Sequence, residues 1–331
     1  MILKLKYLFR LLGDFLIVTL LLGLALNVSK LWGPITKRGF FCGDESLMYP
    51  LHKDTVSHGH LYSVGLGIPV VMIVAISLLE NFVLNSRPSK NCLRTWLMMH
   101  VSLLPFLFGF AAERLLKEIG KLAVGRLRPY FFTVCQPVFG KEYDMTCDWE
   151  AYHGIYIEDY KCSRMDDDTN HLSRITNFHM RTSFPSGHAS LTFYSVTFLV
   201  YYLHRFSRSL RYYQASFGLF VPFMQFAAVL WAWFVALSRV TDYKHHASDV
   251  LAGSLLGMGV GIAVCRYVHS HLKGGRTFLE AINVPKRSPA VRREVDNVEQ
   301  QQQHRPTTAI TTISSGSSYL TATSRSQDEQ I

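Results

Sequence analysis

The sequence predicts an all-α, multi-pass membrane protein built as a bundle of six transmembrane helices. The chain has 331 residues, of which 49% are hydrophobic, and these residues come in long blocks rather than in strand-like alternation. A spanning helix needs about 20 mostly apolar residues. Blocks of this or nearly this length cover residues 11–28, 61–79, 96–112, 188–203, 215–237 and 247–268. A water-soluble protein would not carry six of them.

The first block is expected to remain as the first span. It lacks a clear small-residue cleavage site, and five more apolar blocks follow it, so it does not resemble a removable signal peptide. The third and fourth blocks, residues 96–112 and 188–203, are the shortest. Their polar flanks are expected to continue the helices beyond the hydrocarbon.

Charge predicts the topology. The net charge of +10 would suit a nucleic-acid partner, but its distribution argues against one, because every second connection is basic, as the positive-inside rule requires. These basic residues are Lys4, Lys6, Arg10, Arg87, Lys90, Arg94, Arg205, Arg208, Arg211, Lys273, Arg276, Lys286, Arg287, Arg292 and Arg293. Both termini are therefore expected in the cytoplasm, near anionic inner-leaflet lipids.

The opposite side carries acids and cysteines. The third connection is acidic over residues 142–168 and is expected to be extracytoplasmic. Four cysteines fall on this side, where thiols tend to pair: Cys42, Cys135, Cys147 and Cys162. A disulfide within the third connection is expected, but sequence does not assign the pairing.

Three regions follow from these patterns. Residues 1–10 form a cytoplasmic N-terminus, residues 11–270 the six-span domain, and residues 271–331 a polar tail expected to be disordered. The tail ends in Glu329-Gln330-Ile331, which could add a strand to a PDZ-type groove; a free tail is the alternative. Homo-oligomerisation is left open.

Two cations precede a proline after the third block. Lys121 and Arg128 are seven residues apart and so share one helical face, and Pro129 ends the helix. Arg126 lies on a different face and is expected to be solvated or near lipid headgroups. A lone cation at a membrane border usually snorkels to the headgroups, whereas two on one face suit an anion site equally well.

The stretch SFPSGHAS, residues 183–190, precedes the fourth block. Pro185 suits a position before a helix, and Ser186 and Gly187 leave backbone N–H groups accessible. Such a helix start can bind an anion, which would place His188 beside it. The alternative is a plain helix cap with an interfacial histidine.

The stretch SRVTDYKHHASDV, residues 238–250, precedes the last block and supplies Arg239 as a third cation. His245 and Asp249 are four residues apart, so the carboxylate could orient the imidazole and leave its other nitrogen as a base or nucleophile. Asp242 is the alternative orienting acid. His246 points about 100° away and is expected to be structural.

These stretches lie at one predicted membrane face. Cations with a helix N-terminus suit a phosphate, and a histidine oriented by a carboxylate suits nucleophilic attack on phosphorus. The pattern resembles the type 2 phosphatidic acid phosphatase superfamily. The residues GRLRP and SRVTDYKHHASDV are similar to those of animal lipid phosphate phosphatases, including Wunen-type members. The matching motifs are Lys121 with Arg128-Pro129, then Pro185 to His188, and finally Ser238-Arg239 with His245 and Asp249.

The resemblance implies residue roles. His245 would attack phosphorus, Asp249 would orient it, and His188 would protonate the leaving lipid alkoxide and then activate water. Lys121, Arg128, Arg239 and the Ser186–Gly187 backbone would hold the phosphoryl oxygens, with no metal and no other cofactor.

The resemblance also implies substrates, namely membrane lipid phosphates such as phosphatidate, lysophosphatidate, sphingosine 1-phosphate and ceramide 1-phosphate. The expected location is the plasma membrane, with the site facing outside or a lumen. The alternatives are a superfamily phosphatase specific for polyprenyl or sphingoid phosphates and a non-enzymatic lipid-binding or scaffold protein.

Overall fold

The structure is a computed structural model that describes residues 2–84, 92–147, 150–163, 171–209 and 218–283. The chain divides into two compact units, Met1–Arg276 and Thr277–Ile331. Residues 284–331, with most of the predicted tail and its PDZ-type end, lie outside the described residues.

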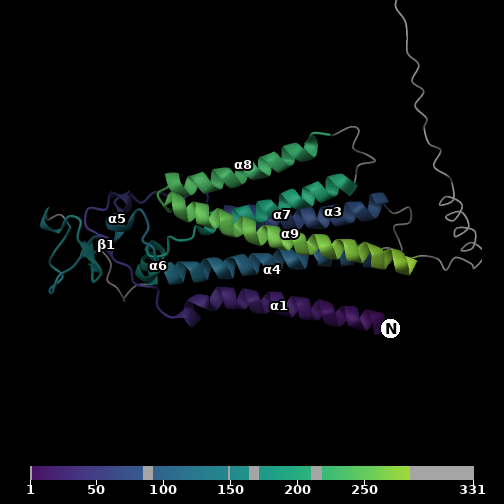
Figure 1. Cartoon of the computed structure of the whole chain (residues 1–331), viewed down its shortest axis with the longest axis horizontal. Helices are drawn as coiled ribbons and strands as arrows, with labels where there is room; N and C mark the ends of the chain where they lie inside the picture. The colour runs from purple at the N-terminus through teal and green to yellow at the C-terminus, as the bar shows by residue number, and fades with distance from the viewer. Residues whose placement is uncertain (1, 85–91, 148–149, 164–170, 210–217, 284–331) are drawn as a thin grey trace, which may run out of the picture. The chain divides into compact units, whose positions relative to one another are not determined.

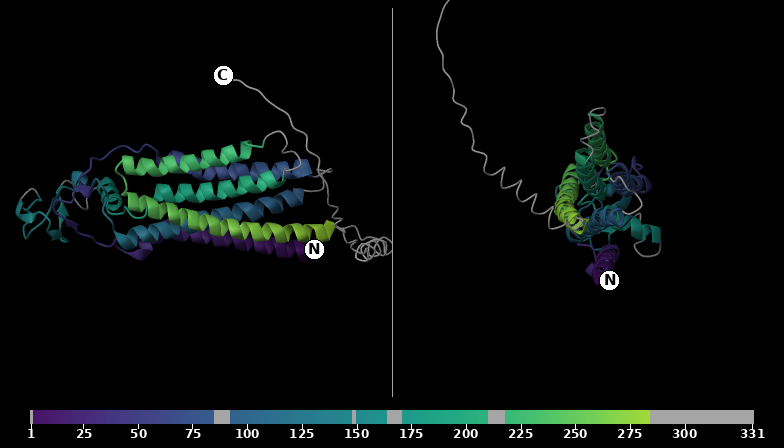
Figure 2. Two further views of the ribbon diagram at one scale, coloured as in Figure 1. Left: turned by 45° about the horizontal axis from the view of Figure 1, so that its top comes forward. Right: turned by 90° about the vertical axis from the view of Figure 1, so that its right-hand side faces the viewer.

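Long helices that run alongside one another make up the bundle (Figures 1 and 2). They are α1 (Ile2–Trp32), α3 (Ile68–Leu84), α4 (Cys92–Val124), α7 (Gly187–Ser209), α8 (Phe220–Thr241) and α9 (Ala247–Asn283). A short helix, α2 (His58–Tyr62), and a π-helical turn at Ser63–Gly67 lead directly into α3. The helix α9 continues through residues 271–283, which the sequence had assigned to the tail.

The all-α, multi-pass fold class is confirmed. Within the described residues, five helices are long and apolar enough to cross a membrane. These segments are Leu11–Trp32, His58–Leu79, Met99–Val124, Phe220–Thr241 and Ala247–His271. The fourth predicted span corresponds to α7, which is helical over 23 residues but is not among the five, so a total of six stays a prediction.

The helix α7 forms the centre of the bundle, where it packs against α3, α4 and α8. Its residues Tyr194 and Phe198 are fully buried and contact Phe106 of α4. A helix surrounded by other helices meets little lipid, so serine and threonine can occur along it. The central position of α7 thus explains why it is less apolar than the five helices named above.

Glycines bring α9 close to α7. A Cβ on Gly253 or Gly257 would collide with the backbone carbonyl oxygen of Ser186 or Ser190, and one on Gly261 would lie 2.9 Å from Thr197 Cβ. Glycines spaced by four residues on one helical face are a common device for close packing of membrane helices. Here they hold the start of α7 against the start of α9.

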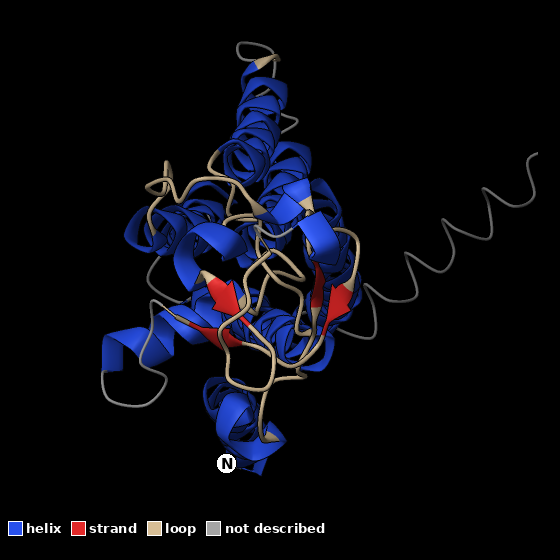
Figure 3. Ribbon diagram, turned by 90° about the vertical axis from the view of Figure 1, so that its left-hand side faces the viewer, coloured by secondary structure: helices blue, strands red, loops and turns tan. Residues whose placement is uncertain are grey.

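A cap of short elements covers the end of the bundle where α4 ends and α9 begins, as the view in Figure 3 shows. Its elements are a 3₁₀ turn at Glu45–Leu47, α5 (Phe131–Cys135), a 3₁₀ turn at Glu150–Tyr152 and α6 (His171–Met180). Two antiparallel pairs add β1 (Phe40–Phe41) with β3 (Tyr156–Ile157), and β2 (Pro137–Val138) with β4 (Lys161–Cys162).

Two disulfides close the cap. Cys135 and Cys162 are joined within the third connection, as expected, while Cys42–Cys147 ties the first connection to the third. Aromatic residues of this cap, Phe40, Phe131 and Tyr160, pack around the bridges. All four cysteines that were expected on one side of the membrane therefore lie in the cap.

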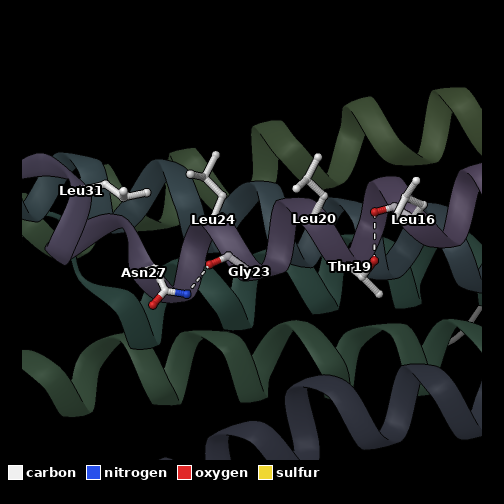
Figure 4. A pocket seen from close by; sticks show the side chains of 7 residues that line it. All are labelled: Leu16, Thr19, Leu20, Gly23, Leu24, Asn27 and Leu31. Atoms are coloured by element: carbon white, nitrogen blue, oxygen red, sulfur yellow. Dashed lines mark hydrogen bonds between the residues drawn. The ribbon is translucent and has the colours of Figure 1, made fainter.

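The helix α1 contacts α4 and carries an open, mainly apolar groove on one side (Figure 4). Its lining residues are Leu16, Thr19, Leu20, Gly23, Leu24, Asn27 and Leu31. The two polar side chains bond within their own helix, since Thr19 donates to the carbonyl of Leu16 and Asn27 to that of Gly23. The groove thus matches hydrocarbon rather than a polar ligand.

Candidate active site

The three motifs converge at the capped end of the bundle. Lys121 lies in the last turn of α4, His188 in the first turn of α7, and Arg239 near the end of α8. His245 precedes α9 and Asp249 occupies its first turn. The C-terminal ends of α4 and α8 and the start of α9 lie at the same end of the bundle in Figure 1. A backbone bond joins two of the motifs, since Ser186 N–H donates to the carbonyl of Asp249 at 3.0 Å.

His245 is buried and has a fixed tautomer. It is 4% exposed, and its Nδ1 lies 2.7 Å from the backbone oxygen of Ser183. Because a carbonyl can only accept, Nδ1 carries the proton and Nε2 keeps a lone pair. Burial, and then the cations of Arg128 and Lys121, hold the pKa of His245 well below its usual value. The imidazole is therefore neutral at neutral pH, the state that a nucleophile needs.

Asp249 supports His245 indirectly. Its Oδ2 is 4.0 Å from His245 Nδ1, beyond hydrogen-bond distance, whereas it accepts from the Ser183 hydroxyl at 2.6 Å. The expected direct carboxylate–imidazole bond is thus replaced by a contact through Ser183, whose carbonyl holds the ring. Asp249 lies in the first turn of α9, and the Ser183 carbonyl oxygen is closer to the His245 ring than the carboxylate is.

Arg126 differs from expectation. It does not point only to solvent or headgroups, because its Nη1 donates to Asp249 Oδ1 at 2.6 Å and to Ser248 Oγ at 2.7 Å. The residue falls after the end of α4, so the helical angle used to place it does not apply there. Arg126 neutralises the buried carboxylate.

His246 is engaged through both its ring and its backbone, and its structural role stays a prediction. Its Nε2 donates to the carbonyl of Leu127 at 3.1 Å, and its backbone N–H donates to Asp249 Oδ2 at 3.1 Å. Burial, with the Arg126 cation next in size, lowers the pKa of His246. The ring thus fastens the loop after α4 to the start of α9.

His188 is held by a segment that the sequence gave no reason to notice. Its Nε2 lies 3.1 Å from the carbonyl oxygen of Val56, so Nε2 carries the proton and Nδ1 has the lone pair. The ring also contacts that of His58, with centroids 4.8 Å apart. The connection before α2 therefore contributes to the site.

Arg239 is the most enclosed cation, at 1% exposure. Its Nη1 donates to Asp54 at 2.8 Å and its Nη2 to Asp242 at 2.8 Å. Both Nε and Nη2 also donate to Ser238 Oγ. Asp242, the alternative orienting acid, thus binds Arg239, and it also accepts from the N–H and hydroxyl of Thr55 at 2.8 and 2.6 Å.

The other predicted cations are also engaged. Lys121 Nζ lies 3.1 Å from Glu118 Oε1, and Arg128 donates to the carbonyl of Lys244 at 3.2 Å. Although burial would raise the pKa of Asp54, the Lys244 and Arg239 cations hold it below its ordinary value. Burial lowers the pKa of Lys244, against the effect of Asp54.

At the start of α7, the backbone N–H of Ser186, one of the predicted phosphate donors, already donates a hydrogen bond within the protein. The Ser186 N–H bonds to Asp249, but the Ser186 hydroxyl is buried and has no hydrogen-bond partner among the described residues. Gly187, the first residue of α7, lies at the helix end where N–H groups lack helical acceptors. The turn therefore offers an anion site made of one hydroxyl and the first turn of α7.

Sequence reasoning missed several residues of this site. They are Asp54, Val56, His58, Arg126, Ser183 and Lys244. Ser183 lies within the SFPSGHAS stretch and Lys244 lies beside His245 and His246. Their proximity to these motifs could have indicated that both belong to the site. Val56 acts through its backbone, which no side-chain pattern reveals.

Comparison with known proteins identifies the family. Residues 102–273 match the model of the PAP2 superfamily, and the chain belongs to this superfamily. It is 36% identical over 270 residues to a Drosophila melanogaster protein named "Putative phosphatidate phosphatase", a match covering 76% of this chain and 66% of that protein.

Mammalian relatives match at similar levels. Identity to phospholipid phosphatase 1 of Rattus norvegicus is 35%, over 72% of this chain and 77% of the relative. Identity to phospholipid phosphatase 2 of Homo sapiens is 34%, over 72% and 75%. No solved structure matches the chain. The recognition of the superfamily from the three motifs is confirmed.

Proposed function

We propose that this protein is a membrane-embedded lipid phosphate phosphatase that acts through a phosphohistidine at His245. The observation that carries the proposal is the His245 environment: a buried, neutral imidazole whose Nδ1 is fixed by the Ser183 carbonyl, with Arg128 and Lys121 as neighbouring cations. The names of the relatives, phosphatidate phosphatase and phospholipid phosphatase, support the same activity.

The proposed reaction has two displacements. In the first, the Nε2 lone pair of His245 attacks phosphorus and the ester P–O bond breaks, while protonated His188 gives its proton to the departing alkoxide. In the second, His188 takes a proton from water, the resulting hydroxide attacks phosphorus, and the P–N bond breaks. Inorganic phosphate leaves and both histidines return to their starting states, which divides one difficult step into two easier ones.

Cations stabilise the charge on the transferring group. Phosphoryl transfer depends mainly on positioning and on neutralising the equatorial oxygens. Arg239 and Arg128 present planar guanidinium groups and Lys121 a compact ammonium. Incoming phosphate also favours the protonated form of His188, because a nearby anion raises the pKa of a histidine. These groups replace a metal ion in the proposed mechanism.

The proposed substrates are phosphatidate, lysophosphatidate, sphingosine 1-phosphate and ceramide 1-phosphate. A site at the capped end of the bundle lets the lipid tails remain in the bilayer while the headgroup enters. Basic connections at the other end and two disulfides in the cap support a site that faces outside the cell or a lumen, with cytoplasmic termini and a plasma-membrane location.

The test is phosphate release by the purified full-length protein in mixed micelles, with each of the four lipid phosphates offered in turn. Turnover should persist in EDTA and stop with vanadate, which mimics pentacoordinate phosphorus. Turnover lost on chelation and restored by Mg²⁺ would contradict the metal-free mechanism. Binding of these lipids without phosphate release would instead favour a lipid-binding role.

A further inference from the structure

A second lysine of α4, Lys117, lies against the phosphate-binding turn. It is one helical turn before Lys121, is 5% exposed, and packs its stem on Gly187 at the start of α7. A Cβ on Gly187 would be 3.1 Å from Lys117 Cδ and 3.7 Å from its Nζ. The Lys117 ammonium is therefore next to the first turn of α7, where the phosphoryl group is proposed to bind.

The ion pair between Lys117 and Glu113 is long. Glu113, one turn earlier in α4, is fully buried, and its Oε1 is 3.8 Å from Lys117 Nζ. That distance exceeds a hydrogen bond, and within the part of the chain that the structure describes neither carboxylate oxygen of Glu113 has a hydrogen-bond partner. The neighbouring pair is tighter, since Lys121 Nζ lies 3.1 Å from Glu118.

Such a pair is a poor stabilising device. Two buried charges lose their hydration, and only close, well-satisfied geometry compensates for that loss. Ionisable residues within membrane helices are rare and usually functional. A lysine that lies beside an anion site and 3.8 Å from its counter-ion can transfer its interaction from that carboxylate to a bound anion.

We propose that Lys117 is a further phosphate-binding residue of this site. In the free protein Glu113 balances its charge; when a phosphomonoester binds, the Lys117 ammonium donates to a phosphoryl oxygen beside Gly187. The buried Ser186 hydroxyl, for which the described residues supply no hydrogen-bond partner, donates to the same group. This inference rests on the proposed phosphatase function and adds a fourth cation to its site.

The competing explanation is that Glu113 and Lys117 form a purely structural pair. A charge-free double variant separates the two. If the pair is structural, Lys117→Met and Glu113→Gln each leave an uncompensated charge, and combining them restores both stability and the KM. If Lys117 binds phosphate, the combination restores stability but not the KM.

The experiment measures steady-state kinetics on phosphatidate and the rise in apparent Tm caused by vanadate, for the wild type and these three variants. Lys117→Met and the double variant should show a KM raised about tenfold or more, the effect of one lost charged hydrogen bond, with a smaller change in kcat. Both should lose most of the vanadate-induced rise in Tm. Glu113→Gln should keep the wild-type KM within about twofold, since its partner is still free to bind phosphate.

Lys37→Met is the matched control, because Lys37 is an exposed cation of the first connection that pairs with Asp159 at 2.9 Å. Its KM and vanadate response should equal those of the wild type. A double variant with wild-type KM and wild-type vanadate response would overturn the role of Lys117 while leaving the phosphatase intact. A wild type that hydrolyses no lipid phosphate would overturn the proposed function instead.

Discussion

Two histidines of this site are oriented by backbone carbonyls. Ser183 fixes His245 and Val56 fixes His188, so each ring has one nitrogen protonated and one with a lone pair. A carboxylate at the same place would also stabilise the imidazolium. With a neutral carbonyl there, His245 stays neutral and nucleophilic, and the Asp249 charge is balanced by Arg126 instead.

At the residue scale, the first prediction separates the adjacent histidines. His245→Ala should abolish both the phosphoenzyme and turnover, because it removes the only proposed attacking nitrogen. His246→Ala should retain most turnover, since its ring bonds to the Leu127 carbonyl. Rapid quench with labelled substrate at alkaline pH, followed by peptide mapping, gives the answer. Label on residue 188 or 246 would overturn the assignment.

A second prediction concerns acid stability. The pKa of His245 in the folded protein lies well below its ordinary value of 6.5, so below that pH the unfolded chain binds a proton that the folded protein does not. Its contribution to stability is complete above pH 6.5 and declines as the pH falls below it. Apparent Tm should drop between pH 7.5 and pH 5, values chosen to span this window.

His245→Gln is the control for this effect, because an amide can still donate to the Ser183 carbonyl but does not titrate. The drop in Tm should be smaller in this variant than in the wild type. Equal drops would show that other groups cause the acid sensitivity.

Side-chain spacing identified many of the residues that gather at the capped end of the bundle, and their roles stay predictions. The shared helical face expected for Lys121 and Arg128 was wrong, because α4 ends at Val124, before Arg128. His245 and Asp249 are close in sequence, but they are linked through Ser183 rather than directly. By contrast, Val56 and His188 are 132 residues apart, and Asp54 and Arg239 are 185 apart. Such pairs depend on how the first connection crosses the bundle end, which no local pattern encodes.

At the scale of the helices, α7 shows that apolar blocks predict where a helix lies in the sequence but not where it lies in the bundle. The block at residues 188–203 did predict a helix, which spans Gly187–Ser209. Its central position, and the glycine contacts with α9, depend on tertiary packing. The cap was the least predictable region, since its strands are two residues long and its bridges could not be paired from sequence.

The close contact of α7 and α9 yields a third prediction. Gly257→Ala should destabilise the protein by about 1–3 kcal/mol or more, because the new methyl collides with the Ser190 carbonyl oxygen. Gly259→Ala, on the same helix with nothing within 4 Å, should be neutral or slightly stabilising. Thermal unfolding in detergent measures both. Equal Tm values for the two variants would contradict this packing.

At the scale of the whole molecule, topology yields the fourth prediction. A protease-cleavable tag at residue 155, within the cap, should be accessible on intact cells, and one at residue 310 should be protected, because basic connections remain in the cytoplasm. Protease accessibility of each tag, before and after permeabilisation, gives the measurement. Equal protection of both tags would contradict the orientation.

The engagement of Arg239 has a consequence for turnover. A guanidinium has five N–H groups, and four of those on Arg239 donate to Asp54, Asp242 and Ser238. In the proposed reaction, an incoming phosphate would therefore use the last one or displace the Asp54 carboxylate, which is partly exposed. Because Asp54 is tethered, it competes at a high effective concentration, as any intramolecular ligand does. It would weaken capture of the substrate somewhat, but it would equally speed the departure of inorganic phosphate, so that the product does not remain as an inhibitor.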